Sequence, residues 1–432
     1  MAAPNYGTAQ AQSNLMLQKV NRAIEKVQNL DCALQKRFTS IQGETIGLQA
    51  YRQEIQTEIG GITGAVNLDG GNYFTGSGAQ YVQCIVAPVS ILNVISATKL
   101  AMMISKGGPE ITIVDYVARL IRDVKEKVGH KQNLYLQTNN DGKLASVDSS
   151  WNSVTTTIPL TAGSAGGRLI DLGDQLQMSD GSANMLGTVN ILEVSKNSIG
   201  GLDTVTVDVV PAGASTSSSF YVLNVASGNP VFVAGLQYLV TPSTSGDYFG
   251  QSRAMPYIQS PALNANGAFL TLGGTIAFLQ RMEQALGSER FQSERQKNFF
   301  YLHGANWVSQ QMQGFGKQVT LMQDGKAPVF DGVPSVFAKR TLAGMPALCD
   351  STALVDKVYW LDQSVMNAVR YPGSQAFIPG MVEGGLFWPR QVGGNWNSQS
   401  DAMYQDSVNF FQHNAWAVGI YYGLATQPIF AS

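Results

Sequence analysis

The sequence contains few charged residues. Charged side chains make up 13% of its 432 residues, compared with about 25% in ordinary soluble domains. We expect a surface this poor in charge to be covered largely by further copies of the chain. The 28 Lys and Arg residues nearly balance 30 Asp and Glu residues, and the formal net charge is -2. This balance excludes the strong overall attraction to polyanions that a dedicated nucleic-acid binder has. Any nucleic acid nearby would therefore be enclosed by the protein and not bound tightly.

Cysteines and long apolar runs are also scarce. The three cysteines, Cys32, Cys84 and Cys349, are far apart and odd in number, which indicates neither a disulfide framework nor a zinc site and fits a reducing compartment. No apolar stretch headed by Lys or Arg opens the chain, and no run of about 18 apolar residues occurs. We therefore expect no signal peptide and no contact with a membrane, in a protein made in the cytosol.

Motifs of catalysis are missing as well. No Gly-x-Ser-x-Gly elbow occurs, and the nearest approach to a phosphate loop, Gly314-Phe-Gly-Lys317, is followed by Gln318 where Ser or Thr is needed. None of the three histidines has a metal-ligand spacing, and each is expected to be structural. They are His130, His303 and His413. We predict no enzyme activity and no catalytic, cofactor-binding or metal-binding residues. A pair of carboxylates that only folding brings together leaves no motif in the sequence.

The first 59 residues carry two helical patterns. An apolar seam with a/d spacing is formed by Met16, Val20, Ala23, Val27, Leu30 and Leu34. A second face is formed by Leu48, Tyr51, Ile55 and Ile59 after a joint at Gly43 and Gly47. Two interpretations stay open: amphipathic helices on the chain's own core, or an arm that packs on a neighbouring subunit.

The next segment is almost uncharged. From Gly60 to Thr98 the only charged residue is Asp69, and its first half is rich in Gly, Asn, Thr and Ser. Such a stretch has neither the apolar content for a core nor the charge of a soluble disordered tail. We expect an extended hairpin laid on another subunit, followed by a strand over 81–94 in which Pro88 marks an edge or a bend.

The clearest helix is predicted from Pro109 to Gly129. Pro109 suits the first helical position and Gly129 a stop. Its buried stripe is centred on Val117, Leu120, Ile121 and Val124. The opposite face carries oppositely charged pairs four residues apart.

The remaining sequence mixes strands and helices. Short alternating runs from Trp151 to Ala226 predict a small barrel or sandwich inserted into another domain, with a core that includes Leu176, Val189, Ile191, Val205 and Val207. Helical spacing predicts a helix over 275–286, with Ile276, Leu279, Met282 and Leu286 on one face. A buried strand is expected at 298–303. Residues 415–425 alternate in size and predict a strand with one bare face, which a helix could approach closely.

This order of elements resembles that of the tailed-bacteriophage major capsid proteins with the Hong Kong 97-type fold. Residues 70–78 (Gly-Gly-Asn-Tyr-Phe-Thr-Gly-Ser-Gly) look like the family's E-loop, and 109–129 look like its spine helix. Residues 133–142 resemble the segment after that helix, where family members carry an inserted β-rich domain. Residues 235–286 and 300–307 resemble the axial (A) domain, and 329–336 resemble the family's strand that carries a Gly-hydrophobic-Pro motif.

The resemblance implies an α+β chain divided into six parts. These are an N-terminal helical arm (1–59), the E-loop hairpin and a peripheral-domain (P-domain) strand (60–98), the P-domain with the spine helix (99–150), the inserted β-rich domain (151–228), the A-domain with adjoining P-domain parts (229–405), and a C-terminal P-domain strand (406–432). The implied inter-subunit contacts are made by Gly70, Asn72, Tyr73, Phe74, Thr75 and Gly76. Some relatives cross-link through an E-loop Lys, which residues 60–98 lack.

The implied function is that of a major capsid protein. Hexamers and pentamers of it would form an icosahedral shell around phage double-stranded DNA, without sequence-specific binding. Scaffolding, portal and decoration proteins are implied as further partners, the virion capsid as the location, and the bacterial cytoplasm as the place of assembly. Two alternatives stay open: an encapsulin-like nanocompartment shell, and a β-rich tail protein or adhesin suggested by the Thr/Ser/Gly-rich middle.

Overall fold

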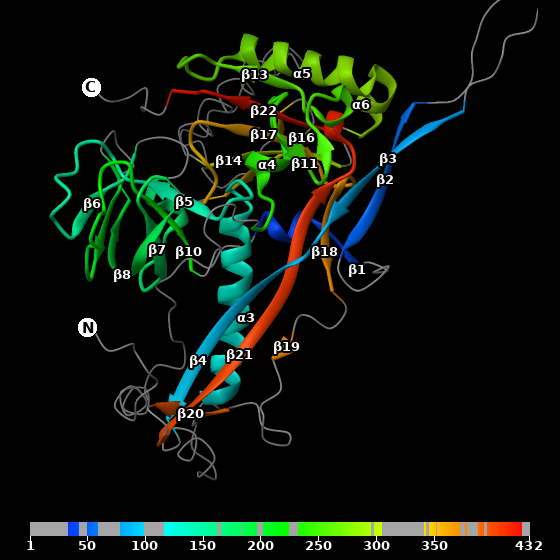
Figure 1. Ribbon diagram of the computed structural model, residues 1–432. Helices are drawn as coiled ribbons and strands as arrows, with labels where there is room; N and C mark the ends of the chain where they lie inside the picture. The colour runs from blue at the N-terminus through cyan, green and yellow to red at the C-terminus, as the bar shows by residue number, and fades with distance from the viewer. Residues whose placement is uncertain are drawn as a thin grey trace, which may run out of the picture.

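The computed structural model describes residues 33–42, 50–58, 78–98, 116–161, 166–182, 184–196, 202–223, 232–294, 298–304, 341–342, 345–350, 352–371, 376–377, 388–392 and 395–425. Three six-stranded sheets surround one long helix, and a two-stranded hairpin projects from them (Figure 1). No helix among these residues is long and apolar enough to cross a membrane.

The first sheet is built on one long strand. Strand β21 (Asn395–Gln412) pairs antiparallel with β4 (Val89–Thr98) along ten residue pairs. The remaining strands of this sheet are β1 (Thr39–Gln42), β18 (Met366–Arg370), β19 (Ala376–Phe377) and β20 (Trp388–Val392). Helix α3 (Tyr116–Tyr135) lies along the β4–β21 ladder (Figure 1). Ile91, Ala402 and Tyr404 are buried on one face of the ladder.

Helix α3 differs at its end from the prediction. It does not stop at Gly129 but continues to Tyr135, because the last turn is buried and its polar side chains all find partners, as described below. Val124 is buried, as predicted. The other three residues of the predicted stripe lie within α3, but their side chains are not among those that the structure describes. They are Val117, Leu120 and Ile121.

The second sheet closes into a small barrel. Its strands are β5 (Lys143–Ser146), β6 (Thr157–Pro159), β7 (Gln175–Ser179), β8 (Met185–Ser195), β9 (Thr204–Val207) and β10 (Ser219–Val222), in the order β5-β10-β7-β8-β9-β6. A bridge between Val147 and Leu160 joins the two ends. All five predicted core residues are buried, at 4% exposure or less. The barrel begins at β5, before the expected start at Trp151, and Val222 N donates to Gly142 O (3.0 Å), so its two ends meet.

The third sheet lies under two helices. Its strands are β13 (Ala262–Asn264), β14 (Phe299–His303), β15 (Thr341–Leu342), β16 (Met345–Cys349), β17 (Val358–Asp362) and β22 (Val418–Tyr422). Helices α5 (Leu272–Leu286) and α6 (Ser288–Glu294) cover it (Figure 1). The predicted buried strand at 298–303 is confirmed, since every residue of β14 is buried. Smaller elements are α4 (Leu236–Leu239), β11 (Asp247–Tyr248), β12 (Gln251–Ser252), and the 3₁₀ turns η1 (Gln35–Arg37), η2 (Gly166–Leu169), η3 (Pro256–Ile258) and η4 (Ala415–Ala417).

Two predictions about this region are partly wrong. Helix α5 ends at Leu286 as expected but begins at Leu272, before the expected start at 275. Ile276 is 46% exposed, and the buried face contains Thr275, Phe278 and Met282. The C-terminal strand starts only at Val418, because residues 415–417 form η4 under an Asn414 cap. The bare face is confirmed at Gly419, where an added Cβ would lie 2.7 Å from Phe278 Cζ on α5.

The prediction of a helix over 48–59 is wrong for the residues that the structure describes. Residues Tyr51–Glu58 form strand β2, which pairs antiparallel with β3 (Gln80–Val86). A four-residue spacing such as Tyr51 to Ile55 places side chains on one face of a strand as well as of a helix, so the pattern did not discriminate. The hairpin therefore begins before Gly60. The N-terminal seam up to Leu30, residues 70–76 and 329–336, and the Lys317 loop lie outside the described residues.

Candidate functional site

One turn of helix α3 carries four polar side chains into the interior. His130, Gln132 and Asn133 are buried, at 4%, 0% and 0% exposure, and Lys131 is nearly so. Buried polar groups cost free energy unless they are hydrogen-bonded. We name residues 130–133 the polar turn. Each of its side chains contacts another part of the molecule.

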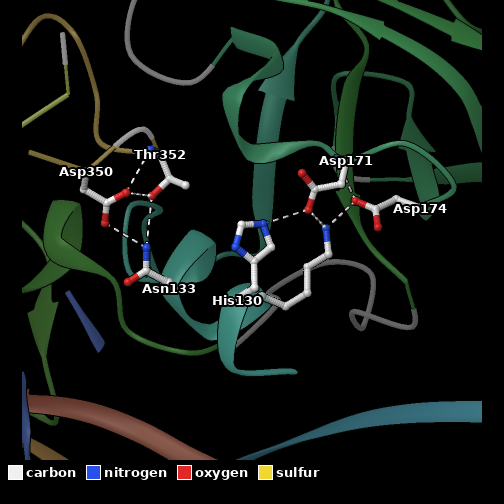
Figure 2. A network of polar contacts seen from close by, with 7 residues as sticks. His130, Asn133, Asp171, Asp174, Asp350 and Thr352 are labelled. Atoms are coloured by element: carbon white, nitrogen blue, oxygen red, sulfur yellow. Dashed lines mark hydrogen bonds and ion pairs between the residues drawn. The ribbon is translucent and has the colours of Figure 1, made fainter. Parts of the chain in front are cut away.

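His130 and Lys131 face the barrel. Lys131 Nζ lies 2.7 Å from Asp171 Oδ2 and 2.5 Å from Asp174 Oδ2, and His130 Nε2 lies 3.2 Å from Asp171 Oδ2. Both carboxylates belong to the loop between η2 and β7, and Asp171 N also donates to Asp174 Oδ2 (2.9 Å). Figure 2 shows this cluster on one side of the helix.

These contacts shift the pKa values of both partners. Burial alone raises the pKa of Asp171, but the His130 hydrogen bond and the charge of Lys131 outweigh it and hold that pKa well below its usual range. Burial lowers the pKa of Lys131, but Asp174 and Asp171 together raise it above its usual value. The cluster is therefore a fixed ion pair at neutral pH.

Asn133 faces the third sheet. Its Nδ2 donates to Asp350 Oδ2 (2.8 Å) and to Thr352 Oγ1 (3.1 Å). Asp350 is fully buried and its Oδ1 accepts from Thr352 N (2.9 Å) and Thr352 Oγ1 (2.6 Å). These residues follow β16 and lie on the side of the helix opposite to Asp171 in Figure 2.

Gln132 faces the first sheet and the N-terminal segment. Its Nε2 donates to Asp406 Oδ2 on β21 (2.7 Å), and its Oε1 accepts from Gln35 Nε2 (2.5 Å). Gln35 N also donates to Asn133 Oδ1 (3.0 Å). The polar turn thus joins the barrel, two sheets and the segment around η1. This arrangement fixes the positions of the parts relative to one another.

The chemistry of these groups is structural. Within the described ranges no group of three His, Cys, Asp or Glu side chains could hold a metal ion. His303 is buried and stacked on Tyr301, and His413 Nδ1 lies 3.1 Å from Asn367 Nδ2. Burial, and then the charge of Asp247, raises the pKa of the Cys84 thiol to about 11, which disfavours the reactive thiolate.

Sequence reasoning missed the polar turn. Of the predicted site residues, only Val124 has a described side chain, and the six expected contact residues between Gly70 and Gly76 lie outside the description. A signal was present, because the stripe through Val124 and Val128 reaches positions 131 and 132 at helical spacing. A lysine and an amide at core-facing positions indicate buried partners, but those partners are distant in sequence.

A second feature is a set of exposed apolar side chains on strands β3 and β4. Tyr81 and Ile85 on β3, and Leu92 and Val94 on β4, are each about half exposed, at 47–59%. Val94 pairs across the ladder with Met403. Figure 1 shows β3 and β4 running along the outside of the molecule. Two such side chains lie on each of these strands, and they are candidates for contact with another copy of the chain.

The fold matches a known capsid chain. The protein shares 12% identity and a TM-score of 0.55 with a chain of the cyanophage A-1(L) capsid asymmetric unit, over 97% of this chain and 99% of that one. It therefore has the mixed, strand-rich fold of that chain. Weaker likenesses are to the capsid of an empty GTA particle (8% identity, 93% and 99% coverage, TM-score 0.46) and to the holo-SrpI encapsulin complex from Synechococcus elongatus PCC 7942 (10%, 95% and 95%, 0.41). No protein-family model and no curated protein matches the sequence.

Proposed function

We propose that this chain is the major capsid protein of a tailed phage. The observation that carries the proposal is the likeness in fold, over nearly the whole of both chains, to a chain of the cyanophage A-1(L) capsid. The low charge content supports it, since 13% charged residues suit a surface buried between copies. We propose no enzymatic role.

The proposed layout is that of the Hong Kong 97-type fold. In it, β2–β3 is the base of the E-loop, α3 is the spine helix, and the β4–β21 sheet belongs to the P-domain. The third sheet with α5 is the A-domain, and the barrel is an inserted domain at 143–222. The close approach of Gly142 and Val222 supports an insertion, because a chain can enter and leave the barrel at one place.

We propose that self-assembly uses the half-exposed apolar side chains of β3 and β4. Contact between the β3 surface of one copy and another surface of the next would be heterologous, and heterologous contacts that close give rings. We propose rings of six and five copies in an icosahedral shell around phage double-stranded DNA, assembled in the bacterial cytoplasm. Scaffolding, portal and decoration proteins would be further partners.

Electron microscopy of the expressed protein tests the proposal. We expect closed, icosahedral shells after expression of the full chain alone or with its phage's neighbouring genes. Nuclease-protected DNA in native particles distinguishes a capsid from a nanocompartment shell, which would hold protein. Trimeric fibres, or monomers under all conditions, would contradict the proposal and favour a tail protein.

A further inference from the structure

An open pocket of about 450 Å³ lies where the N-terminal segment meets the third sheet. Its wall on one side is formed by Lys36, Arg37 and Thr39. On the other side it is formed by Asn298, Gln363 and Ser364, from the loops that precede β14 and follow β17. These residues come from three segments that are far apart in the sequence. The lining is polar and carries two cations and no carboxylate.

No ion pair in the described part of the chain involves the two cations of this pocket. Lys36 and Arg37 are exposed, and among the described residues neither forms an ion pair. Asp362, beside Gln363, is fully buried, and its Oδ1 accepts from Ser364 N (2.8 Å) and Ser364 Oγ (2.6 Å). Its carboxylate is therefore directed into the protein.

Charges of both signs lie behind the pocket wall. Burial, and then the charge of Arg290, lowers the pKa of His413, whereas the charge of Asp362 raises it. His413 contacts Asn367, which is the strand partner of Thr39 in the pocket wall. The exposed charge of the pocket is therefore that of Lys36 and Arg37, in a chain whose net charge is -2.

Two contacts orient the Arg37 side chain. Its Nη1 donates to Gln363 Oε1 (3.4 Å), and its guanidinium lies 5.6 Å from the centroid of the Phe300 ring. A positioned guanidinium with free N–H groups matches the oxygens of a phosphate, and a neighbouring ammonium adds a point charge. The aromatic residue in the lining, Phe38, is buried against Phe410, so it offers no face for stacking a base.

We propose that this pocket binds a backbone phosphate of the enclosed double-stranded DNA. The inference rests on the proposed function and adds a contact point to it. One weak contact in each subunit, repeated over a shell, would hold DNA without a basic chain and without reading its sequence.

Fluorescence anisotropy of isolated subunits with a labelled DNA duplex at low salt tests the pocket. Lys36→Ala/Arg37→Ala is expected to weaken binding about tenfold and to reduce the slope of log affinity against log salt by about 2. Lys125→Ala/Lys127→Ala removes the same charge from the exposed side of α3 and is expected to change binding little. An equal loss in both variants, or none in either, would overturn the inference.

Two further measurements identify the ligand and distinguish the DNA-binding inference from the proposed capsid function. An acidic peptide of matched charge that binds this pocket more tightly than the duplex would overturn the assignment to DNA. If the chain forms shells normally and the pocket variant binds DNA as tightly as the unchanged chain, the proposed function stands and this inference is refuted. If DNA binding depends on the pocket but the chain never forms shells, the pocket binds DNA and the proposed function is refuted.

Discussion

At the scale of single residues, the contact between Lys131 and two aspartates is the strongest test of the polar turn. Lys131→Ala removes the ammonium group from two largely buried carboxylates, and it leaves His130 beside Asp171. We expect a loss of about 3 kcal/mol in the free energy of unfolding, measured by urea denaturation. The matched control is Lys125→Ala, on the exposed side of the same helix, with an expected change of about 0.5 kcal/mol or less. Similar values for both would show that the cluster does not hold the barrel in place.

Asp171 also gives a pH dependence with a definite sign. Because its pKa in the folded protein is below the unfolded value, its ionised form stabilises the fold. That contribution is complete above the unfolded pKa of about 4 and is lost as the pH falls toward the folded value. In Asp171→Asn, stability should therefore fall less between neutral and acid pH than in the unchanged chain. Parallel acid profiles from urea unfolding would contradict this role.

At the scale of elements, Gly419 tests the contact between β22 and α5. A side chain there would meet Phe278 Cζ at 2.7 Å, Pro261 O at 3.0 Å and Met282 Sδ at 3.1 Å. We expect Gly419→Val to cost at least about 2 kcal/mol through overpacking. Gly273→Ala, within α5 and with no atom within 4 Å of the new Cβ, should instead stabilise by about 0.5 kcal/mol. Thermal melts measure both changes, and two changes of the same sign would refute the packing.

The hairpin β2–β3 gives a second test at this scale. The contacts that tie it to β11–β12 include Ile85 N to Phe249 O (3.0 Å) and Gln251 Nε2 to Gln83 O (2.8 Å). A two-stranded hairpin is marginal alone, so its amides should exchange fast in isolated subunits. In assembled shells they should exchange slowly, as a neighbour covers Tyr81 and Ile85. Equal protection in both forms, measured by mass spectrometry, would exclude a contact there.

The elements were predictable where local pattern and burial agree. The barrel core around Val189 and the buried strand β14 are examples, since strict alternation, or a short run of apolar and aromatic residues, favours a strand. The spacing of Tyr51 and Ile55 suits both a helix and a strand, and only the partner strand β3 decides between them. The polar turn was not predictable, because Lys131 and Asn133 meet carboxylates that are 40 and 217 residues away in the chain.

At the scale of the whole molecule, the closed barrel is joined to the described remainder by contacts that include those of Lys131 and Arg168. Lys131 holds it through Asp171 and Asp174, and Arg168 Nη1 donates to Gly304 O (3.1 Å) and Ala353 O (3.4 Å). Its own core is closed by the bridge from Val147 to Leu160. We therefore predict that the barrel folds by itself and that the rest of the chain folds without it.

Excision of the barrel tests this independence. A cut inside it, such as removal of 160–222, would leave β5 and β6 without the strands they pair with, so the cut has to fall outside β5. Since Val222 N and Gly142 O are 3.0 Å apart, a short Gly/Ser linker can replace residues 143–222. We expect a body that still unfolds in one cooperative transition, with Lys131 returned to water and therefore tolerated, and with shells that are less regular or less stable. Insoluble protein from several linker lengths would instead mean that the barrel belongs to the main core.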